Sequence, residues 1–255
     1  MKTEPYIVKE TDSYVAAYKP QQMHTVPLKE TDNTLLAWCA TKSPKILSVC
    51  GGKDIEGGTI HRLDYETNGL VLFAKTQHAF DSIKKQQNEN RFIKTYCALC
   101  RKNFTIPSDF PPLPEEFKIS NIVPLTKSLT LNIYSAFRHY GPGSKAVRPV
   151  LVTGRDNSPQ HAVYKKILFD RGKPYKTFIK DIQTDDKAGE SIIKFTVQLY
   201  RGFRHQIRCH LAWIGYSILN DTLYGSNWTN DYFGLTANKL SFYDPETNEP
   251  ANIVL

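Results

Sequence analysis

Asp64 is the residue around which we expect the chemistry of this chain to gather. It lies between two basic residues, His61 and Arg62, and the turn-forming residues 67–69. The apolar run 70–74 follows at once, which predicts a loop that leads into a buried strand. Neighbouring cations favour an ionised carboxylate, and such a group beside apolar residues is a candidate nucleophile. A single aspartate in a loop is nevertheless more often a turn or cap residue.

Arg208 is the second candidate, and its neighbourhood predicts a helix over 204–214. The apolar residues Ile207, Leu211 and Ile214 are spaced so that they form one stripe on such a helix. Arg208 would lie beside this stripe, where a partly buried arginine needs a carboxylate partner, and Asp64 is available. Arg204 precedes Arg208 by four residues, so both guanidiniums would project from one side of the helix.

Tyr96 is the third candidate, in a strand predicted over 92–99. A tyrosine in a strand most often packs in a core, so a catalytic role requires that Tyr96 face Asp64.

Other kinds of site find less support in the sequence. Cys97 and Cys100 have the spacing of half a zinc site, but no second close Cys/His pair follows. No glycine loop leads into the lysine and helix start of a nucleotide site. A glycosidase needs two carboxylates on opposite sides of a cleft. Glu66 is too close to Asp64 in the sequence to lie across a cleft from it, so Asp221, far along the chain, is the available second carboxylate. We therefore expect no metal, no nucleotide and no other cofactor.

Composition narrows the class of protein. The 255 residues are 40% hydrophobic, enough to bury a sizeable core, and the net charge of +8 is typical of a protein with a polyanionic partner. A solvated basic face without that role is the alternative. The 12% aromatic content slightly favours a nucleic acid, because aromatic rings stack on unpaired bases. No apolar stretch reaches the ~18 residues of a membrane span. The five cysteines are odd in number and are not spaced like a disulfide framework, which indicates a reducing compartment, the cytoplasm.

Periodicity and turn residues predict the elements that would position these groups. We expect an N-terminal hairpin of strands 6–8 and 14–18 that ends before Pro20, followed by a helix over 34–40 that residues 32–33 cap. A strand over 70–75 leads to a second helix, which begins after Thr76, ends near Asn90 and has residues 84–87 on its outer face. A second hairpin consists of strands 175–182 and 191–200, joined by the turn 184–189. The proline-rich segment 101–160 is predicted to be irregular except at 129–137.

Several of these stretches together resemble one family. His61-Arg62-Leu63-Asp64, with Thr67, Gly69 and the run to Ala74-Lys75, resembles the catalytic motif of the RluA family of pseudouridine synthases. Further motifs recur in order: Lys19-Pro20 and His24; Lys94-Thr95-Tyr96 with Ala98-Leu99; His205-Gln206-Ile207-Arg208 with His210-Leu211-Ala212, Ile214-Gly215, Ile218-Leu219, Asp221 and Tyr224-Gly225; and Leu240, Phe242, Pro245 and Thr247. Two positions depart from the family pattern: Asn68 replaces a common serine, and Arg201-Gly202-Phe203-Arg204 replaces a Thr-Gly-Arg-Thr run.

The resemblance implies a fold of the α+β class, the pseudouridine synthase fold, with a long, mostly antiparallel mixed sheet in two halves and a catalytic cleft between them. It implies a single catalytic domain over residues 1–255, with an atypical proline-rich excursion at about 101–160. We expect no separate N-terminal RNA-binding module.

The resemblance also implies a reaction and its residues. The reaction is the isomerisation of uridine to pseudouridine in ribosomal or transfer RNA, with the base flipped out of its helix. Asp64 would be the nucleophile, Arg208 would pair with it, and Tyr96 would stack on the uracil. Arg62 would fill the vacated space and Ile207 would form an apolar wall. We assign RNA contacts to these last two and to His61, Lys94 and Arg204. We expect a cytoplasmic monomer.

Two rival functions stay open. The first is a non-catalytic RNA-binding protein on the same scaffold, which the loss of Asp64 or Arg208 would favour; both residues are present. The second is a hydrolase of glycosidic bonds, which would need a second carboxylate facing Asp64.

Overall fold

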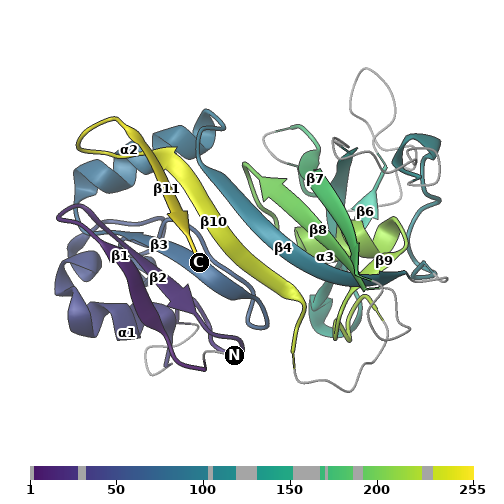
Figure 1. Ribbon diagram of the computed structural model, residues 1–255, viewed down its shortest axis with the longest axis horizontal. Helices are drawn as coiled ribbons and strands as arrows, with labels where there is room; N and C mark the ends of the chain where they lie inside the picture. The colour runs from purple at the N-terminus through teal and green to yellow at the C-terminus, as the bar shows by residue number, and fades with distance from the viewer. Residues whose placement is uncertain are drawn as a thin grey trace. The chain divides into compact units, whose positions relative to one another are not determined.

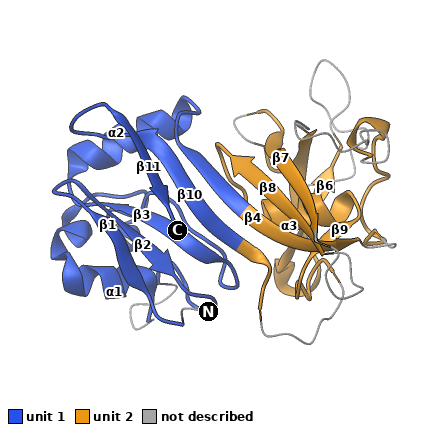
Figure 2. Cartoon of the chain, in the orientation of Figure 1, with its two compact units in different colours: residues 1–96, 236–255 blue, residues 97–235 orange. Residues whose placement is uncertain are grey.

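The computed structural model describes residues 3–27, 33–102, 106–118, 131–151, 167–169, 172–185, 192–225 and 232–255. The chain divides into two compact units, which Figure 2 shows in different colours: Met1–Tyr96 with Thr236–Leu255, and Cys97–Leu235. The first boundary lies inside a strand, β4 (Ile93–Lys102), which begins in the first unit and ends in the second. Both chain ends belong to the first unit (Figure 1).

The sheet of the first unit has the strand order β1-β2-β3-β10, and β11 lies off this path, paired with β10. Its strands are β1 (Tyr6–Glu10), β2 (Tyr14–Lys19), β3 (Asn68–Ala74), β10 (Leu235–Tyr243) and β11 (Pro250–Val254). All neighbours are antiparallel except β3 and β10, which are parallel. The predicted N-terminal hairpin is confirmed, and β2 ends before Pro20 because proline cannot donate to the ladder.

One face of this sheet carries the hydrophobic core of the first unit. Alternate residues of β2, β3, β10 and β11 point into it, among them Tyr14, Leu72 and Phe242. The helix α2 (Gln77–Asn88) covers this face with Ala79, Phe80 and Ile83. Its predicted cap is confirmed, because the Thr76 hydroxyl accepts a hydrogen bond from the Ala79 amide at 3.1 Å.

Gln86 corrects the expectation that residues 84–87 form the outer face of α2. Its side chain is buried and makes two 2.8 Å hydrogen bonds with the backbone of Tyr243. A glutamine therefore ties α2 to the end of β10.

A second correction concerns the turn expected at residues 67–69. β3 already begins at Asn68, and Gly69 pairs with Ala237 of β10. Gly69 has a φ of +126°, and a Cβ atom there would lie 2.2 Å from the Ala237 carbonyl oxygen. Glycine is needed because the two backbones approach too closely for any side chain.

The remaining elements of the first unit lie between β2 and β3. They are the helix α1 (Leu35–Lys42) and two short 3₁₀ helices, η1 (Pro44–Ser48) and η2 (Asp54–Glu56). Thr34 caps α1 by accepting from the Ala37 amide at 3.2 Å. The expected cap at 32–33 is therefore wrong at Asn33, while residue 32 lies outside the described residues.

The second unit contains the strand order β4-β8-β7-β5-β6, with β9 (Tyr216–Ile218) beside β4. Its other strands are β5 (Leu131–Tyr140), β6 (Ala146–Val150), β7 (Tyr175–Asp185) and β8 (Ile192–Leu199). The β7–β8 hairpin is confirmed, and Ile193, Phe195, Val197 and Leu199 are buried as the alternation predicts. Part of its turn, residues 186–189, lies outside the described residues.

The segment 101–160 is more regular than expected where it is described. β5 and β6 form an antiparallel pair, so the prediction of irregular chain after residue 141 is wrong at 146–150. Two short 3₁₀ helices, η3 (Glu115–Phe117) and η5 (Pro142–Ser144), belong to the same segment. Residues 103–105, 119–130 and 152–160 lie outside the described part of the chain.

The helix α3 (Gln206–Trp213) differs most from its prediction. All eight of its residues are buried, so it is a core helix and not an amphipathic one. It contacts β6, β7 and β9. Arg204 precedes the helix and His205 has a left-handed φ of +54°, so Arg204 and Arg208 do not share a helix face.

Helices in the described part of the chain are all too short or too polar to cross a membrane.

Candidate active site

The loop that carries Asp64 is fixed by hydrogen bonds on both sides of this residue. Leu63 is held by Thr25, whose hydroxyl accepts from the Leu63 amide at 3.1 Å and lies 3.2 Å from its carbonyl oxygen. After Asp64, the Tyr65 carbonyl accepts from the Gln22 amide at 2.9 Å, and the Thr67 amide donates to the Asp64 carbonyl at 3.1 Å. Asp64 itself is half-buried. A reacting carboxylate needs a fixed position of this kind.

Lys19 lies under this loop and is fully buried. Its ammonium group donates to the carbonyls of Pro20 at 2.9 Å, Met23 at 2.7 Å and Tyr65 at 3.3 Å. Burial lowers the pKa of Lys19 to about 7, although the carboxylates of Asp64 and Glu66 oppose the shift. The sequence marked Lys19 only as part of a motif, and its role as a support of the Asp64 loop was missed.

Tyr96 lies in the part of β4 that belongs to the first unit, and its side chain is buried. Burial raises the pKa of Tyr96, and the negative charge of Asp64 raises it further. The charge of Asp64 therefore acts on the phenol, and a catalytic role for Tyr96 stays a prediction. Contact with a uracil stays a prediction.

His61 corrects the expectation of two cations beside Asp64. The residue is 9% exposed, and its ring packs on Phe92 with the ring centres 5.6 Å apart. Burial lowers the pKa of His61 well below its ordinary value, and the cations of Lys94 and Lys84 lower it further. His61 is therefore neutral at pH 7 and cannot help to keep Asp64 ionised. Its burial also does not support direct contact with RNA.

The other RNA-contact residues of the first unit differ in exposure. Arg62 extends into solvent, where its Nη1 lies 3.1 Å from Oε1 of Glu56. Lys94 is buried, so its charge acts on groups inside the unit, including His61.

Arg208 is positioned by the carboxylate of Asp221, which the sequence offered as a remote glycosidase residue and as part of a family motif, but not as the partner of Arg208. Its Nε and Nη2 donate to the two carboxylate oxygens of Asp221, both at 2.8 Å. The two side chains are 2% and 0% exposed, so the ion pair is fully buried. The guanidinium also lies over the rings of Phe233, at 5.0 Å, and Tyr224, at 5.5 Å. This arrangement leaves the guanidinium no freedom to turn; a pairing with Asp64 stays a prediction.

His205 and Tyr224 extend the buried network around Arg208. The Val147 amide donates to the Tyr224 hydroxyl at 2.7 Å, so this hydroxyl can give its proton to His205 Nδ1, 3.1 Å away. Burial lowers the pKa of His205 to about 3, and the cation of Arg208 contributes. His205 is therefore a neutral acceptor.

The two remaining predicted contacts of this unit are Arg204 and Ile207. Arg204 is exposed and donates to the Ser144 carbonyl at 3.3 Å, whereas Ile207 is buried in α3. Arg204 thus keeps the exposure that an RNA contact needs.

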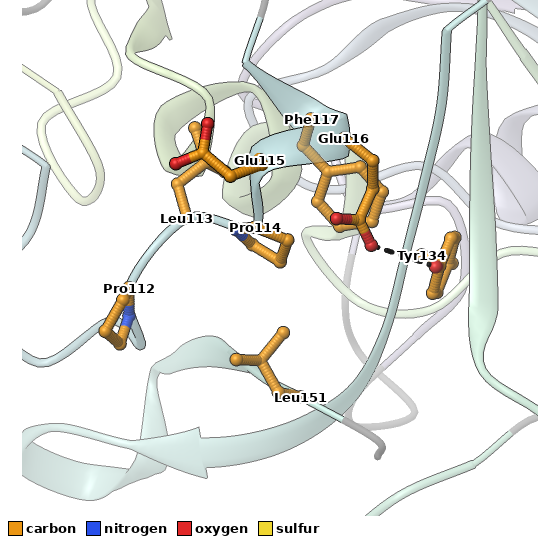
Figure 3. A pocket seen from close by; sticks show the side chains of 8 residues that line it. All are labelled: Pro112, Leu113, Pro114, Glu115, Glu116, Phe117, Tyr134 and Leu151. Carbon is orange, nitrogen blue, oxygen red and sulfur yellow. Dashed lines mark hydrogen bonds between the residues drawn. The ribbon is translucent and has the colours of Figure 1, made fainter. Parts of the chain in front are cut away.

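A separate hollow of about 410 Å³ lies in the second unit (Figure 3). Its lining residues are Pro112, Leu113, Pro114, Glu115, Glu116, Phe117, Tyr134 and Leu151. The Tyr134 hydroxyl donates to Glu116 at 3.2 Å, and Glu115 pairs with Lys118. Since both carboxylates have partners and the rest is mostly apolar, this lining offers no evident reacting group.

Among the described residues, no cluster of histidine, cysteine and carboxylate side chains could hold a metal ion.

The family model described as RNA pseudouridylate synthase matches residues 13–213, which is most of the chain and includes Asp64, Tyr96 and Arg208. The chain belongs to the RNA pseudouridylate synthase family.

Known pseudouridine synthases from several organisms resemble this pseudouridylate synthase. RNA pseudouridine synthase 1 of Oryza sativa subsp. japonica is 29% identical over 204 residues, which are 74% of this chain but only 57% of the rice protein. The dual-specificity RNA pseudouridine synthase RluA of Vibrio parahaemolyticus is 25% identical over 256 residues, covering 96% of this chain and 81% of that protein. The Escherichia coli protein of the same name is 22% identical over 227 residues, covering 88% and 79%. The resemblance to the RluA family is confirmed.

Solved structures confirm the fold of the pseudouridylate synthase. Human RNA pseudouridylate synthase domain containing 1 matches with a TM-score of 0.63 and 18% identity, over 99% of this chain and 83% of that one. Human RNA pseudouridylate synthase domain containing 4 matches with a TM-score of 0.62 and 14% identity, over 98% and 87%. The α+β class is therefore confirmed. As a member of this family, the protein is an RNA-modifying isomerase.

Proposed function

We propose that this pseudouridine synthase uses Asp64 as the nucleophile, or as the group that receives and returns the ribose. The reaction breaks the bond from ribose to a ring nitrogen and joins the ribose to a ring carbon, so it needs neither an oxidant nor an added group. The observation that carries the proposal is the half-buried Asp64 carboxylate, held on a loop that hydrogen bonds fix on both sides. Its charge acts on Lys19 and Tyr96.

Arg208 pairs with Asp64 in this proposal and keeps it ionised. The support comes from the Arg208–Asp221 pair, which occupies Nε and Nη2 and fixes the direction of the remaining guanidinium nitrogen. An immobile donor stabilises charge better than a mobile one, because it needs no reorganisation during the reaction.

The uridine must leave its helix to reach Asp64, because the reacting atoms are inaccessible in a base-paired stack. Tyr96 stacks on the extruded uracil and Ile207 forms an apolar wall. Arg62 fills the vacated position, which suits its exposure two residues before Asp64. Arg204, which is exposed, adds a contact to RNA, whereas the buried Lys94 acts through its charge on groups inside the unit. We no longer assign an RNA contact to His61, which is a buried, neutral group in this proposal.

The substrate is ribosomal or transfer RNA. The net charge of +8 supports an RNA partner of either kind. The Vibrio relative is named dual-specificity, so more than one RNA should be assayed. Residues 1–255 act as one catalytic domain, as a monomer in the cytoplasm. A family match that crosses both units supports the single domain.

Replacement of Asp64 by asparagine tests the nucleophile. Asp64→Asn keeps the size of the side chain but removes the attacking charge, so we expect no detectable pseudouridine, while the dissociation constant for RNA changes by less than about threefold. Pseudouridine is mapped in total RNA from cells that lack the gene and carry either the wild-type or the variant copy. Asp81→Asn, an exposed residue of α2, is the matched control and should retain conversion.

Conversion by Asp64→Asn would show that another group attacks the ribose. If the wild-type protein binds RNA but converts no uridine in either RNA class, the non-catalytic RNA-binding alternative holds.

A further inference from the structure

Glu56 forms an ion pair with Arg62 from an anchored position. The pair joins Arg62 Nη1 and Glu56 Oε1 at 3.1 Å, and its side chains are 57% and 18% exposed, respectively. Glu56 is the last residue of η2. Its amide donates to the Lys53 carbonyl at 2.9 Å, and its own carbonyl accepts from the Thr59 amide at 3.1 Å. The Thr59 hydroxyl donates to the same carbonyl at 2.5 Å. The carboxylate is thus held on a fixed turn, while the guanidinium is the exposed and movable partner.

Lys84 brings a second cation to this place from α2. Its ammonium group donates to the Ile60 carbonyl at 2.7 Å, and Gln87 of the same helix donates to that carbonyl at 3.3 Å. Burial lowers the pKa of Lys84; the charge of Glu56 opposes this shift, and that of Arg62 adds to it. Two cations and one carboxylate therefore act on one another next to the Asp64 loop, with a surplus positive charge among them.

We propose that Arg62 and Lys84 form a binding site for one backbone phosphate of the RNA, and that the Glu56 carboxylate occupies this site until the RNA arrives. The proposal rests on the proposed function, since it assumes that RNA enters beside Asp64. A carboxylate and a phosphate present similar oxygen acceptors to a guanidinium. An exposed ion pair is weak, so a phosphate can displace Glu56 from Arg62.

The displacement has a use in the reaction. Arg62 has five N–H donors, so it can hold a phosphate and still lie beside the vacated base position. Until RNA binds, Glu56 keeps the guanidinium near that position and screens it from unproductive anions. Glu56 is therefore a positioning residue that acts through Arg62, at a cost in RNA affinity.

The test measures binding of a hairpin RNA with uridines in its loop by fluorescence anisotropy, over a salt series from about 50 to 200 mM. Glu56→Gln should bind this RNA about 3–10-fold more tightly than wild type, because the competing carboxylate is lost. Lys84→Gln should bind more weakly, with a salt slope shallower by about 0.7–0.9, the value for one lost phosphate contact.

Two further variants separate the site from a general charge effect. Glu89→Gln removes the same charge from the exposed Glu89–Arg91 pair and should leave affinity within about twofold of wild type. In an Arg62→Gln background, Glu56→Gln should no longer increase affinity, because the residue acts through Arg62. Equal effects of Glu56→Gln and Glu89→Gln, or an undiminished effect without Arg62, would overturn the proposal.

Pseudouridine formation on the same RNAs distinguishes failure of the phosphate site from failure of the proposed function. If wild-type protein converts uridine and Glu56→Gln still binds like Glu89→Gln, only the phosphate site fails. If wild-type protein converts no uridine in any RNA offered, the proposed function fails and the phosphate site loses its premise. An unchanged melting temperature of Glu56→Gln shows that the altered affinity is not a folding effect.

Discussion

Lys19 has a buried amino group that donates hydrogen bonds to backbone carbonyl oxygens. Three of these carbonyls, including that of Tyr65, accept its hydrogen bonds, so its protonation is tied to the geometry beside Asp64. Burial disfavours the charged form, and the pKa of Lys19 falls from 10.5 to about 7. Titration of a single lysine should therefore be visible in the stability of the protein.

Lys19→Met should flatten the dependence of stability on pH. Between pH 7 and 10.5 the unfolded chain binds a proton at Lys19 that the folded chain has lost. The free energy of unfolding of the wild-type protein should therefore rise through this window, by up to about 1.4 kcal/mol per pH unit, relative to the variant. Urea unfolding at several pH values measures the difference. Parallel curves for the two proteins would contradict the shifted pKa.

A second prediction concerns the buried ion pair of Arg208 and Asp221. Asp221→Asn leaves a buried guanidinium without its counter-charge, so we expect a loss of about 3–5 kcal/mol in the free energy of unfolding. Arg208→Met should cost a similar amount because it strands the carboxylate. The double variant should lose clearly less than the sum, since neither charge remains. Chemical denaturation of the three variants provides the cycle, and additive losses would mean that the pair is not coupled.

Among the elements, β3 shows how the sheet positions the active-site loop. All seven of its residues are buried, and it follows Asp64 after three residues. Its pairing with β10 at Gly69 is possible only because no Cβ is present. The sheet thereby fixes the end of the loop, as Lys19 and Thr25 fix its interior.

Gly69→Ala should disrupt this anchor. The new Cβ would lie 2.2 Å from a backbone carbonyl that cannot move alone, so we expect a loss of more than about 3 kcal/mol in stability. Gly172→Ala is the control: Gly172 also has a positive φ, but a Cβ there meets nothing within 4 Å. It should cost only the backbone strain, about 1 kcal/mol. Thermal unfolding compares the two, and equal losses would show that the close approach to β10 is unimportant.

For the molecule as a whole, the proposed catalytic residues come from two compact units. Asp64 and Tyr96 belong to the first unit and Arg208 to the second. The pairing of Asp64 with Arg208 is thus a hypothesis about how the units cooperate, and kinetics can test it.

Arg208→Met should lower turnover on the order of a hundredfold and move the acidic limb of the pH–rate profile to higher pH. A carboxylate without its counter-charge protonates more readily, so less of Asp64 would be ionised at a given pH. Arg208→Lys, which keeps the charge but not the two-pronged contact, should move the limb less. Single-turnover rates, measured below the melting temperature of each variant, provide the comparison. A limb that does not move would separate Arg208 from Asp64.

The sequence by itself determined the family, the α+β class, the strands around Asp64 and the cap of α2. The family and the α+β class follow from the resemblance of ordered motifs, whereas the strands and the cap follow from local order: alternation of apolar residues and a threonine before a helix. It also indicated the candidate residues Asp64, Tyr96 and Arg208, whose roles remain predictions.

Tertiary structure alone decided which groups surround those residues. His61 is neutral because Phe92 and the rest of the core bury it, and Arg208 meets Asp221, thirteen residues further along the chain. The all-buried helix α3 and the close approach at Gly69 depend on neighbours from distant strands. Burial and charge pairing are properties of the packed chain, so the state of the residues beside Asp64 could not be deduced from the local order that first singled it out.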